Sequence, residues 1–312
     1  MRPEILLTGA VEPRLMADLD AAYRVHRLWQ AADRDALLAA VADSVTGVVT
    51  RSVIGADAAL MTALPKLEVV AVFGVGTDAV DLAAARRQGV RVANTPGVLT
   101  EDTADYGMAL LLALARRIVE GDRHVRQGRW PRGLLPNSTR VNGKKLGVVG
   151  LGRIGAGVAR RAEAFAMQVF YTGPKAKSDV PWTYVDTTQA LAREVDFLVL
   201  TCPGGPATAG LVDERVLEAL GPHGMLVNIA RASVVDEQAL VSALKKGKIK
   251  AAALDVFPDE PNVSSDFLAM ENVILEPHIA STTVETRMAI CDMVLENLAA
   301  HYAGRVPPGI VG

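Results

Sequence analysis

The chain has 312 residues, of which 50% are hydrophobic and 22% carry a charge, a composition typical of folded enzymes with about two domains. Its formal net charge of -2 excludes a general attraction to nucleic acid or to an anionic membrane. An acidic substrate therefore needs a local cluster of arginine, lysine or histidine side chains.

The apolar stretches of the sequence are too short to cross a membrane. Met108–Ala115, the most apolar of them, is far shorter than the roughly 20 residues of a bilayer span, and the first ten residues do not resemble a signal peptide. Cys202 and Cys291 lie far apart, which fits the reducing cytoplasm and excludes a disulfide framework and a cysteine-based zinc site. We expect a soluble, cytoplasmic protein without a metal.

In the first third of the chain, short apolar runs alternate with alanine-rich segments of helical spacing. Ile5–Leu7, Val48–Val49 and Val69–Phe73 are predicted to be buried strands. Strands that alternate with helices predict a parallel sheet covered by helices on both faces, so the fold class is α/β.

A cluster of helix-breaking residues, Asn94–Gly97, follows this first series and predicts a domain boundary near residue 98. Thr100 can cap a long helix that runs to Arg116–Arg117. A more polar arm then continues to Gly128–Pro131.

The second strand–helix series begins at Lys145, continues to about Ser281, and is followed by a final helix around Thr283–Tyr302. Lys145–Val149 is predicted to be a strand, and a GxGxxG motif follows it directly, before a helix from about Ile154 to Phe165. This context is the one in which such glycines bind a dinucleotide pyrophosphate at a helix N-terminus. The loop consists of Gly150, Leu151, Gly152, Arg153, Ile154 and Gly155, and Arg153 can add positive charge.

The next predicted strand, Val169–Tyr171, ends where such folds usually carry an acidic residue for the adenosine ribose. Here the chain continues with Thr172–Lys177 and has no carboxylate in that segment. Thr172, Gly173 and Lys175, with Lys177 as a further candidate, can therefore accept a 2′-phosphate, which favours NADP(H) over NAD(H). Two alternatives stay open: the lysines are solvated loop residues, or Asp179 takes the acidic role.

Charged residues follow the ends of the strands predicted at Met225–Asn228, Ile249–Leu254 and Val273–Leu275. In parallel α/β sheets, ligands gather at the carboxyl ends of strands. Each residue alone has an ordinary structural explanation, but together they form a mechanism: a histidine exchanges a proton, a carboxylate supports it, and an arginine binds a substrate carboxylate. The residues are Arg231, Asp255, Glu260 and His278.

Taken together, these motifs resemble the D-isomer-specific 2-hydroxyacid dehydrogenase family, and particularly its glyoxylate/hydroxypyruvate reductase branch. The resemblance covers nearly the whole chain. It rests on VVGLGRIG, NIARASVVDEQAL, ALDVFPDEP and EPHIAS, which occur in this order and at family-like spacing.

The resemblance implies roles for individual residues. Arg231 would bind the substrate and activate its carbonyl, Glu260 would tune the histidine, and His278 would be the general acid/base. Asp255 would hold the nicotinamide carboxamide, and the amides of Val75 and Gly76 would grip the substrate carboxylate. Further residues would line the cofactor site: Thr103, Cys202, Pro203, Ile229 and Ala230. The contacts near the adenine are less defined, because this chain departs from the family pattern at residues 201–206.

The resemblance also implies two Rossmann-like domains with parallel sheets. A flavodoxin-like substrate domain would comprise residues 1–98 and 283–312, and a dinucleotide-binding domain would comprise residues 99–282. Residues 100–140 would form a dimerisation helix and arm in a homodimer. Trp130 would either reach the partner's active site or have a plain packing role.

The function implied is an NADPH-preferring reductase that converts small 2-oxo acids such as glyoxylate and hydroxypyruvate to D-2-hydroxy acids, with NAD(H) as an alternative cofactor. Hydroxyphenylpyruvate is an alternative substrate. A non-catalytic dinucleotide-sensing regulator is an alternative of another class, which the presence of Arg231, Glu260 and His278 disfavours.

Overall fold

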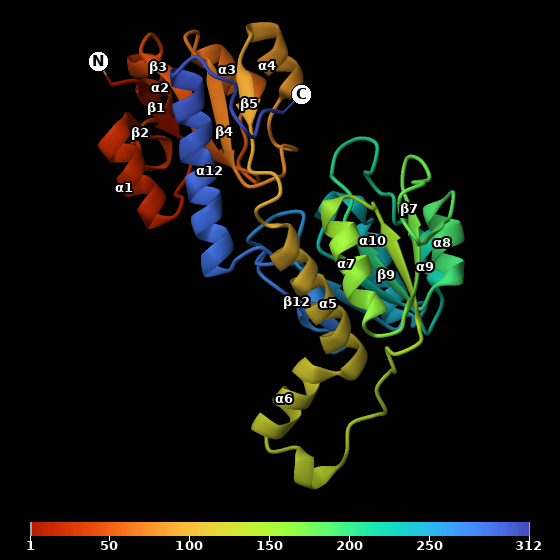
Figure 1. Cartoon of the computed structure of the whole chain (residues 1–312). Helices are drawn as coiled ribbons and strands as arrows, with labels where there is room; N and C mark the ends of the chain where they lie inside the picture. The colour runs from red at the N-terminus through yellow and green to blue at the C-terminus, as the bar shows by residue number, and fades with distance from the viewer. Residues whose placement is uncertain (1, 312) are drawn as a thin grey trace. The chain divides into compact units, whose positions relative to one another are not determined.

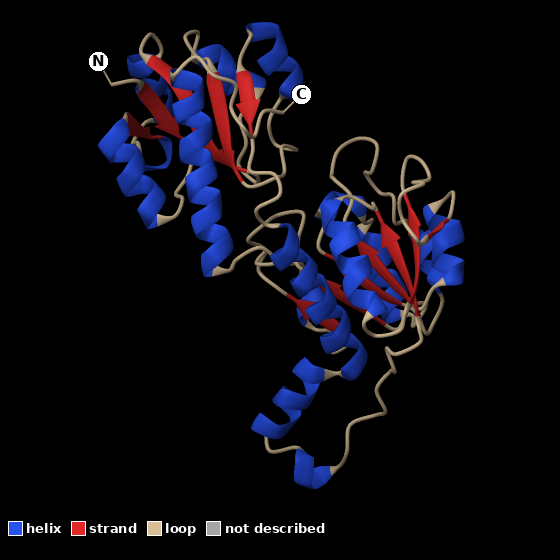
Figure 2. Cartoon of the chain, in the orientation of Figure 1, coloured by secondary structure: helices blue, strands red, loops and turns tan. Residues whose placement is uncertain are grey.

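The computed structural model describes residues 2–311 and divides the chain into two compact units (Figure 1). The first unit contains Met1–Leu99 and Thr282–Gly312, and the second contains Thr100–Ser281. Figure 2 shows that each unit consists of strands with helices against them. The expected α/β class with two Rossmann-like parallel sheets is confirmed.

The first unit contains a five-stranded parallel sheet in the order β2-β1-β3-β4-β5, which is the flavodoxin-like order. Its strands are β1 (Glu4–Leu7), β2 (Arg24–Arg27), β3 (Val45–Arg51), β4 (Val69–Phe73) and β5 (Arg91–Ala93). Its helices are α1 (Pro13–Ala22), η1 (Leu28–Gln30), α2 (Arg34–Val41), α3 (Ala58–Ala63), α4 (Leu82–Gln88) and α12 (Val284–Tyr302).

The last helix returns to this first unit. α12 packs on β4 and on α1, and Thr283 caps it by accepting a 3.1 Å hydrogen bond from the Thr286 amide. Near the other end of α12, the Tyr302 hydroxyl lies 3.0 Å from Thr46 Oγ1 on β3. A helix that packs on this sheet thus comes from more than two hundred positions further along the chain.

The second unit contains a seven-stranded parallel sheet in the order β12-β11-β10-β9-β6-β7-β8. Counted from its own first strand, this is the order of a dinucleotide-binding fold with one strand added at the edge. Its strands are β6 (Lys145–Val149), β7 (Gln168–Thr172), β8 (Thr183–Tyr184), β9 (Phe197–Leu200), β10 (Met225–Asn228), β11 (Ala251–Leu254) and β12 (Val273–Leu275). Its helices are α5 (Thr100–Arg116), α6 (Ile118–Arg126), η2 (Trp130–Arg132), α7 (Arg153–Glu163), α8 (Thr188–Glu194), α9 (Glu214–Leu220), η3 (Ala232–Val234), α10 (Glu237–Lys245) and α11 (Ser265–Leu268).

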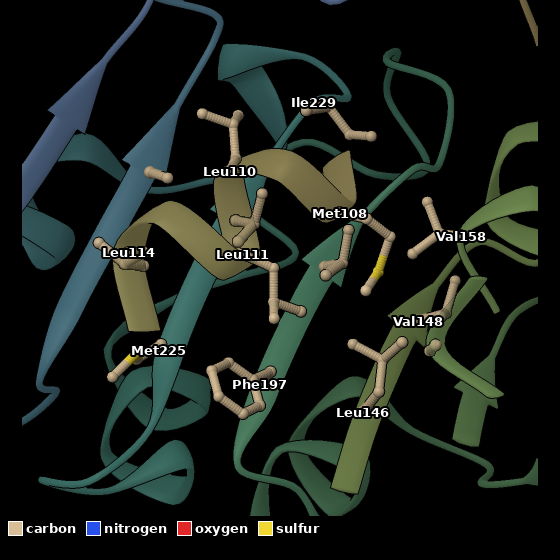
Figure 3. Packing of buried hydrophobic residues seen from close by; sticks show 14 of the residues in the cluster. Met108, Leu110, Leu111, Leu114, Leu146, Val148, Val158, Phe197, Met225 and Ile229 are labelled. Atoms are coloured by element: carbon tan, nitrogen blue, oxygen red, sulfur yellow. The ribbon is translucent and has the colours of Figure 1, made fainter. Parts of the chain in front are cut away.

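The second unit has two clusters of buried apolar residues; one lies between this sheet and α5 (Figure 3), and the other includes residues of α8, α9 and α10. Leu111 of α5, Leu146 of β6 and Phe197 of β9 are all fully buried. Burying an apolar side chain of this size contributes roughly 1.5–3 kcal/mol. A sheet buried on both faces explains why the strands are continuous apolar runs rather than alternating ones.

Some predicted boundaries need correction. α5 begins at Thr100 itself, so Thr100 is a helical residue and does not precede the helix. β11 begins at Ala251, two residues later than predicted. Arg117 has the left-handed φ of 56°, which ends α5 at Arg116 and turns the chain into α6. Among the described helices, none is both long and apolar enough for a membrane span.

Candidate active site

The glycine loop leaves no room for side chains at its first and last glycines. Gly150 has a φ of 92°, and a Cβ there would lie 2.6 Å from the Cα of Cys202. A Cβ on Gly155 would lie 2.4 Å from the Gly150 carbonyl oxygen. Glycine is therefore required at both positions, for the tight turn and for the close packing of α7 on the sheet.

The middle glycine faces open space. A Cβ on Gly152 would meet no atom within 4 Å, and the residue has an ordinary φ of -82°. α7 begins at Arg153, and Gly152 at its N-cap offers no side-chain cap to the first amides of the helix. Uncapped amides at a helix N-terminus are donors for an anion, so these residues fit the pyrophosphate of a dinucleotide. Arg153 is exposed beside them and Ile154 is half-buried.

The last residue of β7 and the residues that follow it lie next to the glycine loop. Thr172 is buried, and its carbonyl oxygen accepts a 2.9 Å hydrogen bond from the Gly150 amide. Gly173 is half-buried and Lys175 and Lys177 are exposed. Within residues 2–311, neither lysine takes part in an ion pair. The two lysines therefore offer positive charge for a phosphate group of a ligand that is bound at the glycine loop.

The structure brings His278 and Glu260 together. Nδ1 of His278 lies 2.7 Å from Oε2 of Glu260, and Oε1 of Glu260 accepts a 3.1 Å hydrogen bond from the Phe257 amide. Burial alone raises the pKa of Glu260, but the bonds from His278 and Phe257 and the charges of His278 and Arg231 hold this pKa below its ordinary value. Glu260 is therefore ionised at neutral pH and fixes the histidine ring, whose Nε2 accepts no bond from the described residues.

Asp255 holds the backbone around His278. The carboxylate is 1% exposed, and its two oxygens accept hydrogen bonds of 2.8 and 2.9 Å from the amides of Ile279 and Ala280. Burial raises the pKa of Asp255, and these two bonds oppose that effect. His278 has the left-handed φ of 56°, which is rare for a residue with a side chain and persists only where the surroundings impose it.

This anchoring contact is a role of Asp255 that the sequence motifs do not reveal. The expected contact with a nicotinamide carboxamide would need the remaining lone pairs of the same oxygens. Strand-end position alone predicts that Asp255 lies in the site, but only the tertiary structure shows which amides it accepts.

Arg231 follows β10 and lies near Glu260. Its Nη1 donates a 2.7 Å hydrogen bond to the Ala230 carbonyl, and its charge contributes to the lowered pKa of Glu260. Asn228 shapes this turn: its Nδ2 donates to the Arg231 carbonyl at 3.1 Å, and its Oδ1 accepts from the Ala230 amide at 3.0 Å. Asn228 is 1% exposed, and its positioning role is absent from the predicted site residues.

The other predicted cofactor residues of the second unit are mostly buried. Thr103, Cys202, Ile229 and Ala230 are each less than 9% exposed, whereas Pro203 is exposed. Burial raises the pKa of the Cys202 thiol to about 11, so it stays neutral and packs as an apolar group.

Val75 and Gly76 lie in the first unit, directly after β4. Gly74 turns the chain there with a φ of 129°, and Asn94 Nδ2 donates a 2.7 Å hydrogen bond to the Val75 carbonyl. Across residues 2–311, no group accepts a hydrogen bond from the amides of Val75 and Gly76. The loop therefore presents two backbone donors, which is a chemistry that suits a carboxylate.

Comparison with known proteins agrees with this chemistry. Residues 108–280 match the family described as "D-isomer specific 2-hydroxyacid dehydrogenase, NAD binding domain". A glyoxylate/hydroxypyruvate reductase A of Arabidopsis thaliana is 44% identical over 301 residues, which cover 96% of both chains. A hydroxyphenylpyruvate reductase of Plectranthus scutellarioides is 46% identical over 302 residues, again covering 96% of both chains.

A solved structure of a similar protein has the same fold. The NADPH-dependent glyoxylate/hydroxypyruvate reductase of Sinorhizobium meliloti, in complex with NADP and malonate, superposes with a TM-score of 0.94 at 41% identity. The match covers 100% of this chain and 97% of that one. The chain therefore belongs to the D-isomer-specific 2-hydroxyacid dehydrogenase family of NAD(P)-dependent oxidoreductases.

Proposed function

We propose that this protein is an NADPH-preferring reductase of small 2-oxo acids of the glyoxylate and hydroxypyruvate type, and that its products are D-2-hydroxy acids. The observation that carries the proposal is the pair of His278 and Glu260, 2.7 Å apart, near Arg231 on the sheet that also holds the glycine loop. A proton donor, its carboxylate partner and a carboxylate-binding cation are the groups that the reduction of a 2-oxo acid needs.

Each group of the site has its own role in the proposed reduction. A bound nicotinamide cofactor supplies the hydride. Arg231 binds the substrate carboxylate and polarises the carbonyl, and His278 donates the proton that converts the carbonyl oxygen into a hydroxyl. Glu260 accepts the hydrogen bond from Nδ1, so that Nε2 faces the substrate, and stabilises the charged imidazole.

Each unit has its own part in this proposal. The second unit, Thr100–Ser281, binds the cofactor through the glycine loop and through side chains and amides of Thr103, Cys202, Pro203, Ile229, Ala230 and Asp255. The first unit is the substrate domain, and its amides at Val75 and Gly76 bind the substrate carboxylate.

The preference for NADPH rests on the segment after β7. Thr172–Lys177 carries no carboxylate that would repel a 2′-phosphate, and Lys175 and Lys177 are exposed without an ion-pair partner among the described residues. The S. meliloti reductase, which is 41% identical, is NADPH-dependent. NADH remains a weaker substitute, since it shares every other group with NADPH.

A second candidate substrate is hydroxyphenylpyruvate, because one of the relatives at 46% identity is a hydroxyphenylpyruvate reductase. This acid has the same 2-oxo carboxylate as glyoxylate, so the roles of Arg231 and His278 do not change. Only the pocket for the remainder of the substrate differs between the two candidates.

Initial rates at 340 nm test the proposal, with NADPH and NADH in parallel against glyoxylate, hydroxypyruvate, pyruvate and hydroxyphenylpyruvate. We expect a kcat/KM at least tenfold higher with NADPH and the highest rate with glyoxylate or hydroxypyruvate. A preference for hydroxyphenylpyruvate would select the second candidate. Cofactor binding without turnover of any 2-oxo acid would reject a reductase of this substrate class.

We further propose a cytoplasmic homodimer that forms through the arm at 100–140. α6 buries none of its residues, and apolar side chains of the arm are exposed in the single chain, Trp130 by 61% and Leu134 by 86%. A cavity of about 330 Å³ lies between α5, α6 and the first residues of β10, β11 and β12. Light scattering of the purified protein tests the dimer, and a monomer at micromolar concentration would reject it.

A further inference from the structure

The segment that we propose to bind the 2′-phosphate is a surface loop whose shape depends on two tyrosine hydroxyls. It starts at Gly173 and ends at Lys177, and the residues between them, like both lysines, are exposed. A short exposed loop loses conformational entropy when it binds a ligand, so contacts that order it beforehand improve binding. Hydrogen bonds tie this loop to the hydroxyls of Tyr171 and Tyr184.

Tyr171 holds the end of the loop. Its ring is 1% exposed and belongs to the core of the second unit. The Lys177 amide donates a 2.7 Å hydrogen bond to the Tyr171 hydroxyl, which in turn lies 3.5 Å from the Lys177 carbonyl oxygen. A side chain of β7 thus fixes the backbone six residues further along the chain.

Tyr184 holds the start of the loop. It lies on β8 directly beside Tyr171 in the parallel register, and its hydroxyl donates a 3.2 Å hydrogen bond to the Gly173 carbonyl. The two rings are 5.4 Å apart with an angle of 59° between their planes, and the Val185 amide bonds to the Tyr171 carbonyl at 2.8 Å. The tyrosines therefore form one unit that ties both ends of the loop to the edge of the sheet.

The other neighbour of the loop is the glycine loop. The Gly150 amide donates to the carbonyl of Thr172, so the chain just before Gly173 is tied to the pyrophosphate-binding turn. With Thr172 fixed on one side and Lys177 on the other, Lys175 is confined to a short arc between them. Confinement of a cation near the ribose position favours a dianionic phosphate and does nothing for a ribose hydroxyl.

We propose that Tyr171 and Tyr184 are positioning residues for cofactor selectivity, because their hydroxyls order the Gly173–Lys177 loop that receives the 2′-phosphate. This inference rests on the proposed NADPH preference. Neither tyrosine is assigned a contact with the cofactor, and neither takes part in the transfer of hydride or proton.

The test replaces each hydroxyl and keeps each ring, in Tyr171→Phe and Tyr184→Phe. Loss of one anchoring hydrogen bond is expected to raise the KM for NADPH about 3- to 10-fold. The KM for NADH and the kcat with either cofactor should change less than about twofold, since NADH has a neutral 2′-hydroxyl in place of the phosphate. Calorimetry with adenosine 2′,5′-bisphosphate and with AMP checks the same selectivity without turnover, and only the bisphosphate should bind more weakly to the variants.

Tyr302→Phe is the matched control. Tyr302 is half-buried, like Tyr184, and its hydroxyl also has one hydrogen-bond partner, Thr46 Oγ1 at 3.0 Å, but it lies in the first unit. Its variant should lose a similar amount of thermal stability and keep the wild-type ratio of the two KM values. Tyr184 lies on the edge strand, so its variant should fold even if Tyr171→Phe does not.

The outcomes separate this inference from the proposed function. If the wild type prefers NADPH, Lys175→Ala lowers that preference, and both tyrosine variants keep the wild-type ratio, the positioning role is wrong and the proposed function stands. If the wild type does not prefer NADPH, the cofactor part of the proposed function and this inference fail together. A parallel rise of both KM values in the tyrosine variants would also reject the inference, because it indicates a general loss of structure.

Discussion

Each unit contains a histidine–glutamate pair whose contact is shorter than 3 Å. His278 and Glu260 are 2.7 Å apart in the second unit, and His26 Nε2 and Glu4 Oε2 are 2.8 Å apart in the first. The contact with histidine holds the pKa of the glutamate below its ordinary value in both pairs. Distance and charge alone therefore do not distinguish them.

The positions of the two pairs in the fold distinguish them. His26 lies within β2, an edge strand, and Glu4 is also bonded to Arg24 and to Ser44. His278 follows β12 at the carboxyl edge of its sheet, where the chain holds a left-handed φ and Arg231 contributes its charge. Ligands of parallel sheets bind at that edge. The comparison teaches that a histidine–carboxylate pair signals proton chemistry only where a ligand can reach it.

The largest expected effect separates the two pairs directly. His278→Ala should lower kcat for 2-oxo acid reduction by about 10³-fold, within the range of general acid–base catalysis, because no other group replaces its proton. NADPH affinity, measured by fluorescence titration, should change less than about twofold. His26→Ala should leave kcat unchanged. Turnover of His278→Ala near the wild-type rate would reject the acid/base role.

A smaller effect is expected at the carboxylates. Glu260→Gln should lower kcat about 10- to 100-fold, because the imidazole loses the carboxylate that orients its ring. Glu4→Gln should leave kcat unchanged. A kcat of Glu260→Gln within about twofold of the wild type would contradict the orienting role of the carboxylate.

The same variant has a pH-dependent effect on stability. Because the folded pKa of Glu260 lies below its ordinary value, the group stabilises the folded chain above about pH 4.3, and this contribution is lost as the pH falls through the folded pKa. The Tm difference between wild type and Glu260→Gln should therefore be present at pH 7 and shrink toward pH 3. A constant difference would contradict this linkage.

Gly152→Ala tests the role of the glycine loop, which belongs to the second unit. A Cβ at Gly152 meets no protein atom within 4 Å, so folding should be unaffected, but it occupies the space that a pyrophosphate needs. We expect a KM for NADPH about tenfold higher with a Tm within about 1 °C. Gly121→Ala, whose Cβ has its nearest neighbour at 3.8 Å in the arm, is the control. An unchanged KM for NADPH in Gly152→Ala would show that the pyrophosphate does not bind next to Gly152.

The sequence predicts the second unit better than the first, and the reason is local. β6, β10 and β12 are short apolar runs followed by glycine or charged residues, and their observed bounds match the predicted ones. β2 and β5 of the first unit are absent from the predicted strands, because RVHR is polar at a sheet edge and RVA is only three residues long. The pairing of these two strands with β1 and β4 comes from tertiary context. β8 and β9 of the second unit are also absent from the predicted strands, although FLVL of β9 is an apolar run.

The same limit applies to the site. Strand-end position predicts Arg231, Glu260 and His278, and the structure brings the last two into contact. The supports of the site, Asn228 and Asp255, act through backbone groups that no side-chain pattern reveals. Asn228 and Asp255 both lie within the motifs NIARASVVDEQAL and ALDVFPDEP, but the backbone groups that they bond follow only from the tertiary structure.

The smallest expected effect concerns the first unit, where such a backbone contact supports the Val75–Gly76 loop. Asn94→Ala removes the 2.7 Å bond from Asn94 Nδ2 to the Val75 carbonyl, while the Asn94 backbone stays bonded to Gly309 and Asn297. The KM for the 2-oxo acid should rise about 3- to 5-fold, and the KM for NADPH should stay constant, because only the proposed carboxylate donors lose order. Asn272→Ala, which removes a 3.2 Å bond to the Lys250 carbonyl in the second unit, should change neither KM. If Asn94→Ala instead raises the KM for NADPH and the KM for the 2-oxo acid by the same factor, the proposal that the first unit binds the substrate and the second binds the cofactor is wrong.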